Sequence, residues 1–222
     1  MNSFTDQDPV ARAERRKVES LFASESCYSI IRERVAVATV GRDRDRCAMD
    51  IAKIPTGRAP PHDIFVVVEI PQGSAVKYEV DKASGAVFVD RFLFTATAYP
   101  SAYGFIPGTL APDGDPADAL VLMPTQVVPG AVIRARPIGM LRMEDEKGPD
   151  EKIICVPHER VHPQYTGIDS IFDLPAINRS AIEHFFERYK DLEPDKWVKV
   201  IGWRDRADAE AAIQAAIDAA RQ

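Results

Sequence analysis

The chain has 222 residues, 45% of them hydrophobic and 28% charged, which predicts a compact soluble fold rather than a disordered chain. Its formal net charge is -6, and this argues against a nucleic-acid-binding protein, since such proteins usually carry a basic face. No apolar run approaches the roughly 20 residues that are needed to cross a bilayer, so we expect no membrane partner.

Residues 1–48 differ in character from the rest of the chain. Pro9 to Phe22 predicts a polar helix with too few apolar residues for a strong stripe, and Gly41 to Arg46 is a solvated charge run. Met49 stands directly before the better organised part. We therefore expect residues 1–48 to be an N-terminal extension, either disordered or the product of a misassigned start site, and residues 49–222 to form the folded domain.

The next part of the chain has the patterns of β-strands. Ile64–Ile70 is apolar and β-branched, which predicts a buried strand. Val76–Val80 alternates between apolar and charged residues, and a turn at 81–85 leads to a return strand at 86–94, so a hairpin is expected. Pro and Gly punctuate further short strands at 119–123, 132–141 and 152–156. Strands of this length and spacing predict a small closed barrel.

The C-terminal part changes period. One helical face is formed by the i, i+3, i+4 and i+7 positions Ile182, Phe185, Phe186 and Tyr189. Asn178 or Ser180 is expected to cap this helix. A strand at 197–203 and an alanine-rich helix at 207–220 follow, with Ile213 and Ile217 facing inward. The predicted fold is mainly β with helices at the C-terminal end.

An acidic turn, Asp113-Gly-Asp-Pro-Ala-Asp118, is the first candidate site. Like charges so close together repel and raise one another's pKa, and a turn that gathers them usually holds a cation. The apolar residues 119–123 place the turn at the mouth of a core strand. A solvated turn without a ligand is the alternative, since Asp, Gly and Pro are common turn residues.

A second acidic group brackets Lys147-Gly-Pro149, with Asp145 before it and Asp150 after it. By itself this group also fits the tip of a surface hairpin. Oxygen ligands without neighbouring His or Cys suit a hard ion such as Mg²⁺ better than zinc. The chain's cysteines form no C-x-x-C pair, which argues against a zinc knuckle or a disulfide framework and favours a reducing, cytoplasmic location.

Basic and phenolic side chains accompany these acids in the predicted elements: Lys77, Arg91, Tyr99, Tyr103, Tyr189 and Lys190. Lys and Arg are the usual phosphate ligands, and tyrosine hydroxyls add directed donors. Each residue also has a structural explanation. Lys77 fits an exposed strand face, Arg91 a strand-edge charge, and Tyr189 the core of its helix.

The joint pattern resembles the family I soluble inorganic pyrophosphatases. The family's Asp-x-Asp-Pro-x-Asp signature is matched by Asp113 to Asp118. Other segments match in family order: Glu69-Ile-Pro71, Lys77-Tyr-Glu79, Asp90-Arg-Phe92, Tyr99-Pro-Ser-Ala-Tyr-Gly-Phe105, Asp145 to Lys152, Val156-Pro-His158, His184 to Lys190 and Trp197-Val-Lys-Val200. The resemblance runs from about Met49 to about Trp203, so it implies that 49–222 is a catalytic domain and is silent on 1–48.

The resemblance implies a Mg²⁺-dependent hydrolysis of pyrophosphate, with Asp115 as the general base that takes a proton from the attacking water. Several Mg²⁺ ions would be held by carboxylates: Asp113, Asp118, Asp145, Asp150 and, through water, Glu79. The phosphate groups would be bound by Lys77, Arg91, Tyr103, Tyr189 and Lys190. Supporting roles would fall to Glu69, Tyr99 and Lys152.

The resemblance also implies an OB-like barrel with flanking C-terminal helices, and a homo-oligomer, a hexamer if the chain is of the bacterial type. Two alternatives stay open. A non-catalytic divalent-cation-binding module would explain the acids but not the Lys, Arg and Tyr residues. A hydrolase of organic phosphates is the other, although the chain has neither a G-x-x-x-x-G-K-[ST] nor a G-x-G-x-x-G motif.

Overall fold

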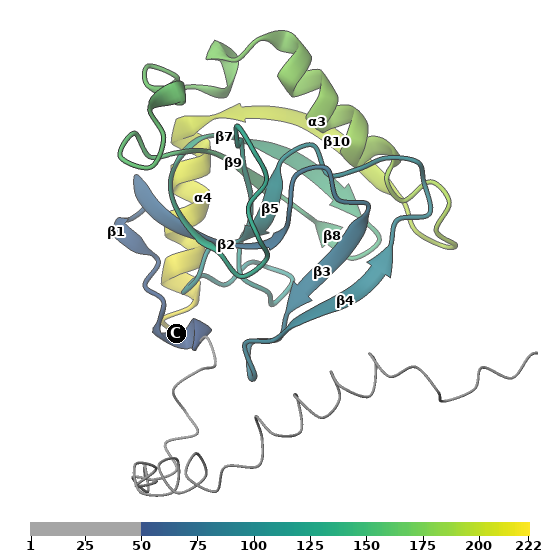
Figure 1. The fold of residues 1–222 in the computed structure, drawn as a ribbon, viewed down its shortest axis with the longest axis horizontal. Coiled ribbons are helices and arrows are strands. Elements are labelled where there is room, and N and C mark those ends of the chain that lie inside the picture. The colour runs from purple at the N-terminus through teal and green to yellow at the C-terminus, as the bar shows by residue number, and fades with distance from the viewer. Residues whose placement is uncertain (1–49) are drawn as a thin grey trace, which may run out of the picture. The chain divides into compact units, whose positions relative to one another are not determined.

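The computed structural model describes residues 50–222 (Figure 1). The predicted N-terminal extension, residues 1–48, lies outside the described residues. No helix within 50–222 is long and apolar enough to cross a membrane. The secondary structure of this part is mainly β, as the sequence predicts.

An eight-stranded sheet forms the body of the fold, with the strand order β1-β2-β5-β6-β9-β7-β10 and β8 paired to β7. An additional pairing of β2 with β7 closes the middle of this sheet into a ring. The prediction of a small closed barrel is therefore confirmed to the extent that the strands close into a ring. The bounds are β1 Gly57–Ala59, β2 Asp63–Ile70, β5 Ala102–Phe105, β6 Asp118–Val121, β7 Val132–Asp145, β8 Gly148–Pro149, β9 Lys152–Pro157 and β10 Val198–Asp205.

The central strand β2 is buried on both sides, because its unbroken apolar run has packing partners on each face. Val66 and Val68 pack in a cluster that includes Ile213 of the C-terminal helix. Val67 points the other way and packs with Ile51. Burying a side chain of this size contributes about 1.5–3 kcal/mol, so this strand fixes much of the core.

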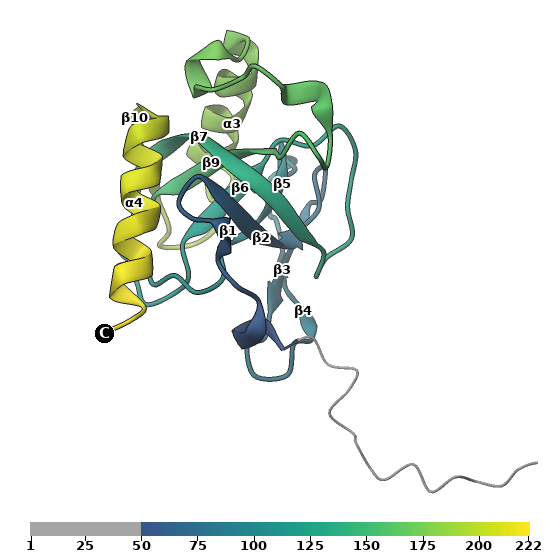
Figure 2. The same ribbon diagram turned by 90° about the vertical axis from the view of Figure 1, so that its left-hand side faces the viewer.

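Two helices cover the ring, α3 Ala176–Arg188 and α4 Arg206–Ala219 (Figure 2). The inward face predicted for α4 is confirmed, because Ile213 and Ile217 are buried. The predicted cap of α3 at Asn178 or Ser180 is wrong. Pro175 occupies the N-cap position, so both polar residues lie inside the helix. Short 3-10 helices complete the fold at Ile51–Lys53, Pro163–Tyr165 and Ile171–Asp173.

The predicted hairpin is present as a separate two-stranded sheet of β3, Val76–Val80, and β4, Val87–Phe92. Its register shifts by one residue: Lys77 pairs with Arg91, whereas Tyr78 pairs with Val89. Asp90 is therefore the extra residue of a β-bulge, and bulges commonly re-aim side chains next to functional sites. The bulge sets Lys77 and Arg91 opposite each other.

Candidate active site

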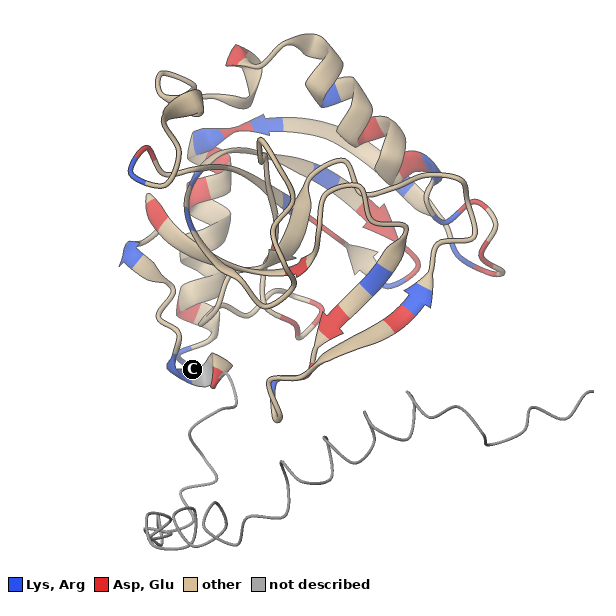
Figure 3. Cartoon of the chain, in the orientation of Figure 1, with Lys and Arg blue, Asp and Glu red and all other residues tan. Residues whose placement is uncertain are grey.

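A cavity of about 790 Å³ lies between the hairpin and the eight-stranded sheet. Figure 3 shows acidic and basic positions next to each other along both hairpin strands. The cavity lining includes every side chain predicted for the site except Tyr99: Glu69, Lys77, Glu79, Arg91, Tyr103, Asp113, Asp115, Asp118, Asp145, Asp150, Lys152, Tyr189 and Lys190. The structure thus brings together residues that are far apart in the sequence.

The acidic turn keeps its shape through local hydrogen bonds. The backbone N–H of Asp115 donates to Oδ1 of Asp113 over 3.1 Å, and the N–H of Ala111 donates to the carbonyl of Asp115 over 2.7 Å. Gly114 has a φ of 91°, a conformation that residues with a side chain rarely adopt. Asp118 begins β6, so the turn is fixed to the ring at that end.

Lys152 is a buried cation shared by two of the predicted metal ligands. Its side chain is 4% exposed, and its Nζ donates to Oδ2 of Asp118 over 2.5 Å and also to Asp150. Burial alone would lower the pKa of Lys152, but Asp118 and Asp150 outweigh it and the pKa ends above its ordinary value. Burial raises the pKa of Asp150. A buried charge is tolerated only when it is paired in this way.

Lys190 is likewise a buried cation that pairs with two carboxylates, at the end of β7. Its Nζ lies 2.7 Å from Oδ2 of Asp145 and 3.3 Å from Oε2 of Glu146. Burial would raise the pKa of Asp145, but hydrogen bonds from Lys190 and from the backbone of Lys147 outweigh it and hold that pKa below its ordinary value. The last residue of α3 is Arg188, so Tyr189 and Lys190 follow the end of the helix.

Glu79 and Asp115 also meet ammonium groups. Lys77 Nζ is 2.6 Å from Glu79 and 3.3 Å from Asp90, and Lys82 Nζ is 2.7 Å from Asp115. Within residues 50–222, no three Asp, Glu, His or Cys side chains form a ready-made metal site. Lysine ammonium groups pair with four of the five predicted metal ligands, Glu79, Asp118, Asp145 and Asp150.

The donor set nevertheless fits the ion that the resemblance implies. Carboxylate oxygens line the cavity without a histidine or a cysteine among them, and this is the chemistry that Mg²⁺ prefers. Asp118 and Asp150 both reach the single ammonium of Lys152. Two of the predicted ligands therefore already share one cation.

Aromatic rings form one wall of the site. Tyr103 and Tyr189 line the cavity, and burial raises the pKa of both phenols well above the ordinary value, so they remain protonated donors at neutral pH. Tyr99 does not line the cavity. It is 3% exposed and packs behind Tyr103, with ring centroids 5.4 Å apart. On the other side Tyr99 packs against Phe185 of α3 at 4.7 Å.

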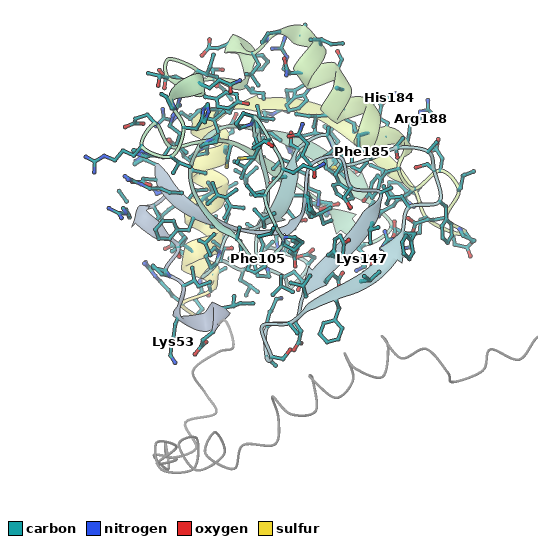
Figure 4. All side chains as sticks on the ribbon, viewed as in Figure 1. Lys53, Phe105, Lys147, His184, Phe185 and Arg188 are labelled. Carbon is teal, nitrogen blue, oxygen red and sulfur yellow. The ribbon has the colours of Figure 1, made fainter. Side chains whose placement is uncertain are left out.

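Figure 4 identifies the two faces of α3 near this wall, where Phe185 is buried while His184 and Arg188 are exposed. The same view labels Phe105 and Lys147, which belong to the cavity lining. Phe105 is 4% exposed, so the wall of the cavity continues into the core.

Glu69 joins the ring to the hairpin. Its Oε1 accepts the backbone N–H of Val80, the last residue of β3, over 2.9 Å. Burial raises the pKa of Glu69 to about 7, although the Val80 hydrogen bond opposes the rise. Burial therefore favours the protonated form of this carboxyl.

Several lining residues were not predicted from the sequence: Asp81, Lys82, Phe88, Glu146, Lys147 and Lys196. Glu146 and Lys147 adjoin the predicted Asp145, so their position along the chain was a usable signal. Lys82 and Lys196 had no such signal. Lys82 lies in the hairpin turn and Lys196 in the loop after α3, and the tertiary fold brings both to the cavity.

The family model for inorganic pyrophosphatase matches residues 66–221. Among curated relatives, the inorganic pyrophosphatase of Gluconobacter oxydans is 70% identical over 173 residues, which cover 78% of this chain and 100% of the relative. That of Aquifex pyrophilus is 57% identical over 170 residues, covering 77% and 96%.

Solved structures agree with these relatives. An inorganic phosphatase from Anaplasma phagocytophilum is 50% identical with a TM-score of 0.75, and the match covers 76% of this chain and 99% of that one. The inorganic pyrophosphatase of Thermus thermophilus is 45% identical with a TM-score of 0.75, covering 78% and 100%. The fold is that of a hydrolase family with an OB-like ring of strands. In particular, the chain belongs to the inorganic pyrophosphatase family.

Proposed function

We propose that this chain hydrolyses inorganic pyrophosphate to two phosphates in the cavity beside the hairpin. The observation that carries the proposal is the joint lining, in which carboxylates meet Lys, Arg and Tyr side chains in one space. Family membership supports the substrate. A non-catalytic cation-binding module would leave the phosphate-binding side chains without a use, and family membership does not favour it.

Metal ions belong to the proposal as well. Asp113, Asp118, Asp145 and Asp150 would hold several Mg²⁺ ions, and Glu79 would hold one through water. Bound Mg²⁺ would offset the charge of pyrophosphate and lower the pKa of a coordinated water from about 15.7 toward neutrality. Lys77 and Lys190, which pair with Glu79 and Asp145, would then be free to bind phosphate oxygens, which accept the same hydrogen bonds.

Asp115 is proposed as the general base. It lines the cavity two positions from Asp113, and the hydrogen bond between them fixes their spacing. Its side chain is 68% exposed, and its partner Lys82 is a half-exposed side chain on the hairpin turn, so the carboxylate is accessible to water. Asp115 would take a proton from the attacking water while the bridging P–O bond breaks in line, and no covalent intermediate is needed.

The phosphate groups would be held from two sides. Lys77 and Arg91 face each other across the hairpin, and their charges would be placed on the departing phosphate. Tyr103, Tyr189 and Lys190 would donate from the opposite wall. We assign supporting roles to three further residues: Glu69, Tyr99 and Lys152. Glu69 anchors the hairpin, Tyr99 packs behind Tyr103, and Lys152 keeps Asp118 and Asp150 together.

The test is a phosphate-release assay on the purified full chain, with pyrophosphate or ATP as substrate, with Mg²⁺ or with a chelator. The proposal expects phosphate from pyrophosphate only when Mg²⁺ is present. A chain that binds Mg²⁺ in calorimetry but releases no phosphate would be a cation-binding module. Efficient release from ATP with Mg²⁺ alone would favour a hydrolase of organic phosphates.

We also propose a cytoplasmic homo-oligomer, a hexamer if the chain follows the bacterial type. Exposed apolar side chains on and beside β4 support self-association: Val87, Phe88, Val89, Phe92 and Phe94. Sedimentation of the full chain measures the assembly directly, and a monomer at micromolar concentration would contradict it.

A further inference from the structure

Glu193 is a buried carboxylate that the proposed mechanism does not use. Its side chain is 5% exposed, and it lies in the loop that follows α3. Both of its oxygens have cationic partners: Oε1 accepts Arg91 Nε over 3.1 Å, and Oε2 lies 2.9 Å from Lys196 Nζ. A carboxylate is buried at this depth only when it is paired and hydrogen-bonded. Glu193 therefore holds two cations at fixed places.

Both cations face the cavity. Arg91 and Lys196 belong to its lining, whereas Glu193 does not. Glu193 takes the Nε hydrogen of Arg91, and Asp90 takes a hydrogen from Nη1 over 2.6 Å. No residue within 50–222 accepts a hydrogen bond from Nη2 of Arg91. The two carboxylates thus fix the guanidinium plane and leave one edge for an anion in the cavity.

Glu193 also connects two walls that are distant in sequence. Its backbone N–H donates to the carbonyl of Lys190 over 2.8 Å, so it belongs to the same short segment as Tyr189 and Lys190. Its side chain reaches across to Arg91 on β4. Residues on both sides of the cavity are expected to bind the same substrate, and this contact links the two sides.

We infer that Glu193 is a positioning residue of the pyrophosphate site, which presents Arg91 and Lys196 together to one phosphate group of the substrate. The inference rests on the proposed function. Glu193 itself touches neither substrate nor metal. Its effect passes through the two cations, because Glu193 holds both of them in place. In other enzymes, a small displacement of a binding group weakens catalysis about a hundredfold.

The test compares Glu193→Gln with a matched control, Glu187→Gln. Glu187 is an exposed acid on α3 and does not line the cavity. Steady-state kinetics with pyrophosphate at saturating Mg²⁺ should give a KM about tenfold to a hundredfold higher for Glu193→Gln, with a smaller change in kcat, because the lost interaction is one of substrate binding. The control should match the unmodified chain.

A purely structural role for Glu193 would lower Tm without changing how Arg91 and Lys196 act. The readout that separates the two roles is a double-variant cycle. If Glu193 works through Lys196 and Arg91, Glu193→Gln should add little to the KM of a Lys196→Gln, Arg91→Gln variant. An additive effect, or a KM equal to that of the control, would overturn the inference.

Folding failure of Glu193→Gln would not end the test, because Lys196→Gln changes a side chain that is 36% exposed. That variant should also raise KM, and an unchanged KM would overturn the pairing of the two cations. The unmodified chain separates the two proposals. If it releases no phosphate from pyrophosphate, the proposed function fails and the inference with it, whereas an active chain with an unaffected variant refutes the role of Glu193 alone.

Discussion

Replacing Glu69 by Gln should stabilise the metal-free protein at alkaline pH. The carboxyl of Glu69 is buried, and its pKa is raised from 4.5 to about 7, chiefly by burial. The folded state therefore binds this proton more tightly than the unfolded state does. The resulting stability is fully present below about pH 4.5 and is lost as the pH rises through 7.

The magnitude follows from the shift. A difference of about 2.5 units at about 1.4 kcal/mol per unit is about 3 kcal/mol of unfolding free energy lost by pH 8. Glutamine has no charge to desolvate, and its amide oxygen can still accept the N–H of Val80 that Glu69 accepts now. The variant should therefore match the unmodified protein at pH 5 and exceed it by up to about 3 kcal/mol at pH 8.

Urea unfolding with a chelator present, repeated at pH 5, 6, 7 and 8, measures this difference. Glu187→Gln serves as the control for removing an exposed acid, and it should give no pH-dependent difference. A stability difference between Glu69→Gln and the unmodified protein that stays constant with pH, or that grows toward acid pH, would refute the reasoning, because it would mean that Glu69 does not change its proton affinity on folding.

Three further predictions concern the cavity. Asp115→Asn should retain Mg²⁺ binding in calorimetry yet lose about a hundredfold to ten-thousandfold in phosphate release, and near-normal turnover would exclude it as the base. Asp118→Ala should instead abolish tight Mg²⁺ binding; unchanged affinity in the same titration would contradict its role as a ligand. Lys152→Met should destabilise the metal-free protein by about 3–5 kcal/mol, because Asp118 and Asp150 lose a buried partner. Denaturation with and without Mg²⁺ measures this loss, and added Mg²⁺ should recover more stability in the variant than in the unmodified protein.

Much of the fold could be predicted because the local patterns agree with the tertiary contacts. The apolar run of β2 and the alternation of β3 appear as strands where they were expected. Strand β5 was missed, since Ala102–Phe105 has no β-branched residue. Its Gly104 approaches β2 so closely that a Cβ would lie 1.9 Å from the Val67 carbonyl oxygen. This close approach between two strands depends on tertiary structure, so local β-propensity does not predict it.

The predicted ends of elements were less accurate. The strand expected to end at Leu141 continues as β7 to Asp145, because its polar end pairs with β10 and β8. The helix expected to begin near Asn178 or Ser180 starts at Ala176, since both polar residues are good caps only when the chain before them is not already helical. Pairing partners and neighbouring turns decide these ends.

Some residues of the candidate site could also be predicted from local sequence, whereas others could not. The acidic turn is a local motif, so Asp113 and Asp118 could be identified as candidate metal ligands from the residues next to them. The roles of single residues such as Tyr99 came only from the resemblance, and the structure places that ring behind the cavity wall. The contact between Arg91 and Glu193 joins residues 102 positions apart, so no local sequence pattern could predict it.

The independence of the hairpin has a consequence for how this protein loses activity. Within residues 50–222, β3 and β4 share no backbone ladder with the eight-stranded sheet. The contacts of Glu69 with Val80 and of Arg91 with Glu193 help to hold the hairpin in place. Mild heat or denaturant can therefore release Lys77 and Arg91 while the ring keeps its hydrogen bonds. Inactivation would then precede global melting, and a bound anion that bridges the two walls would delay it.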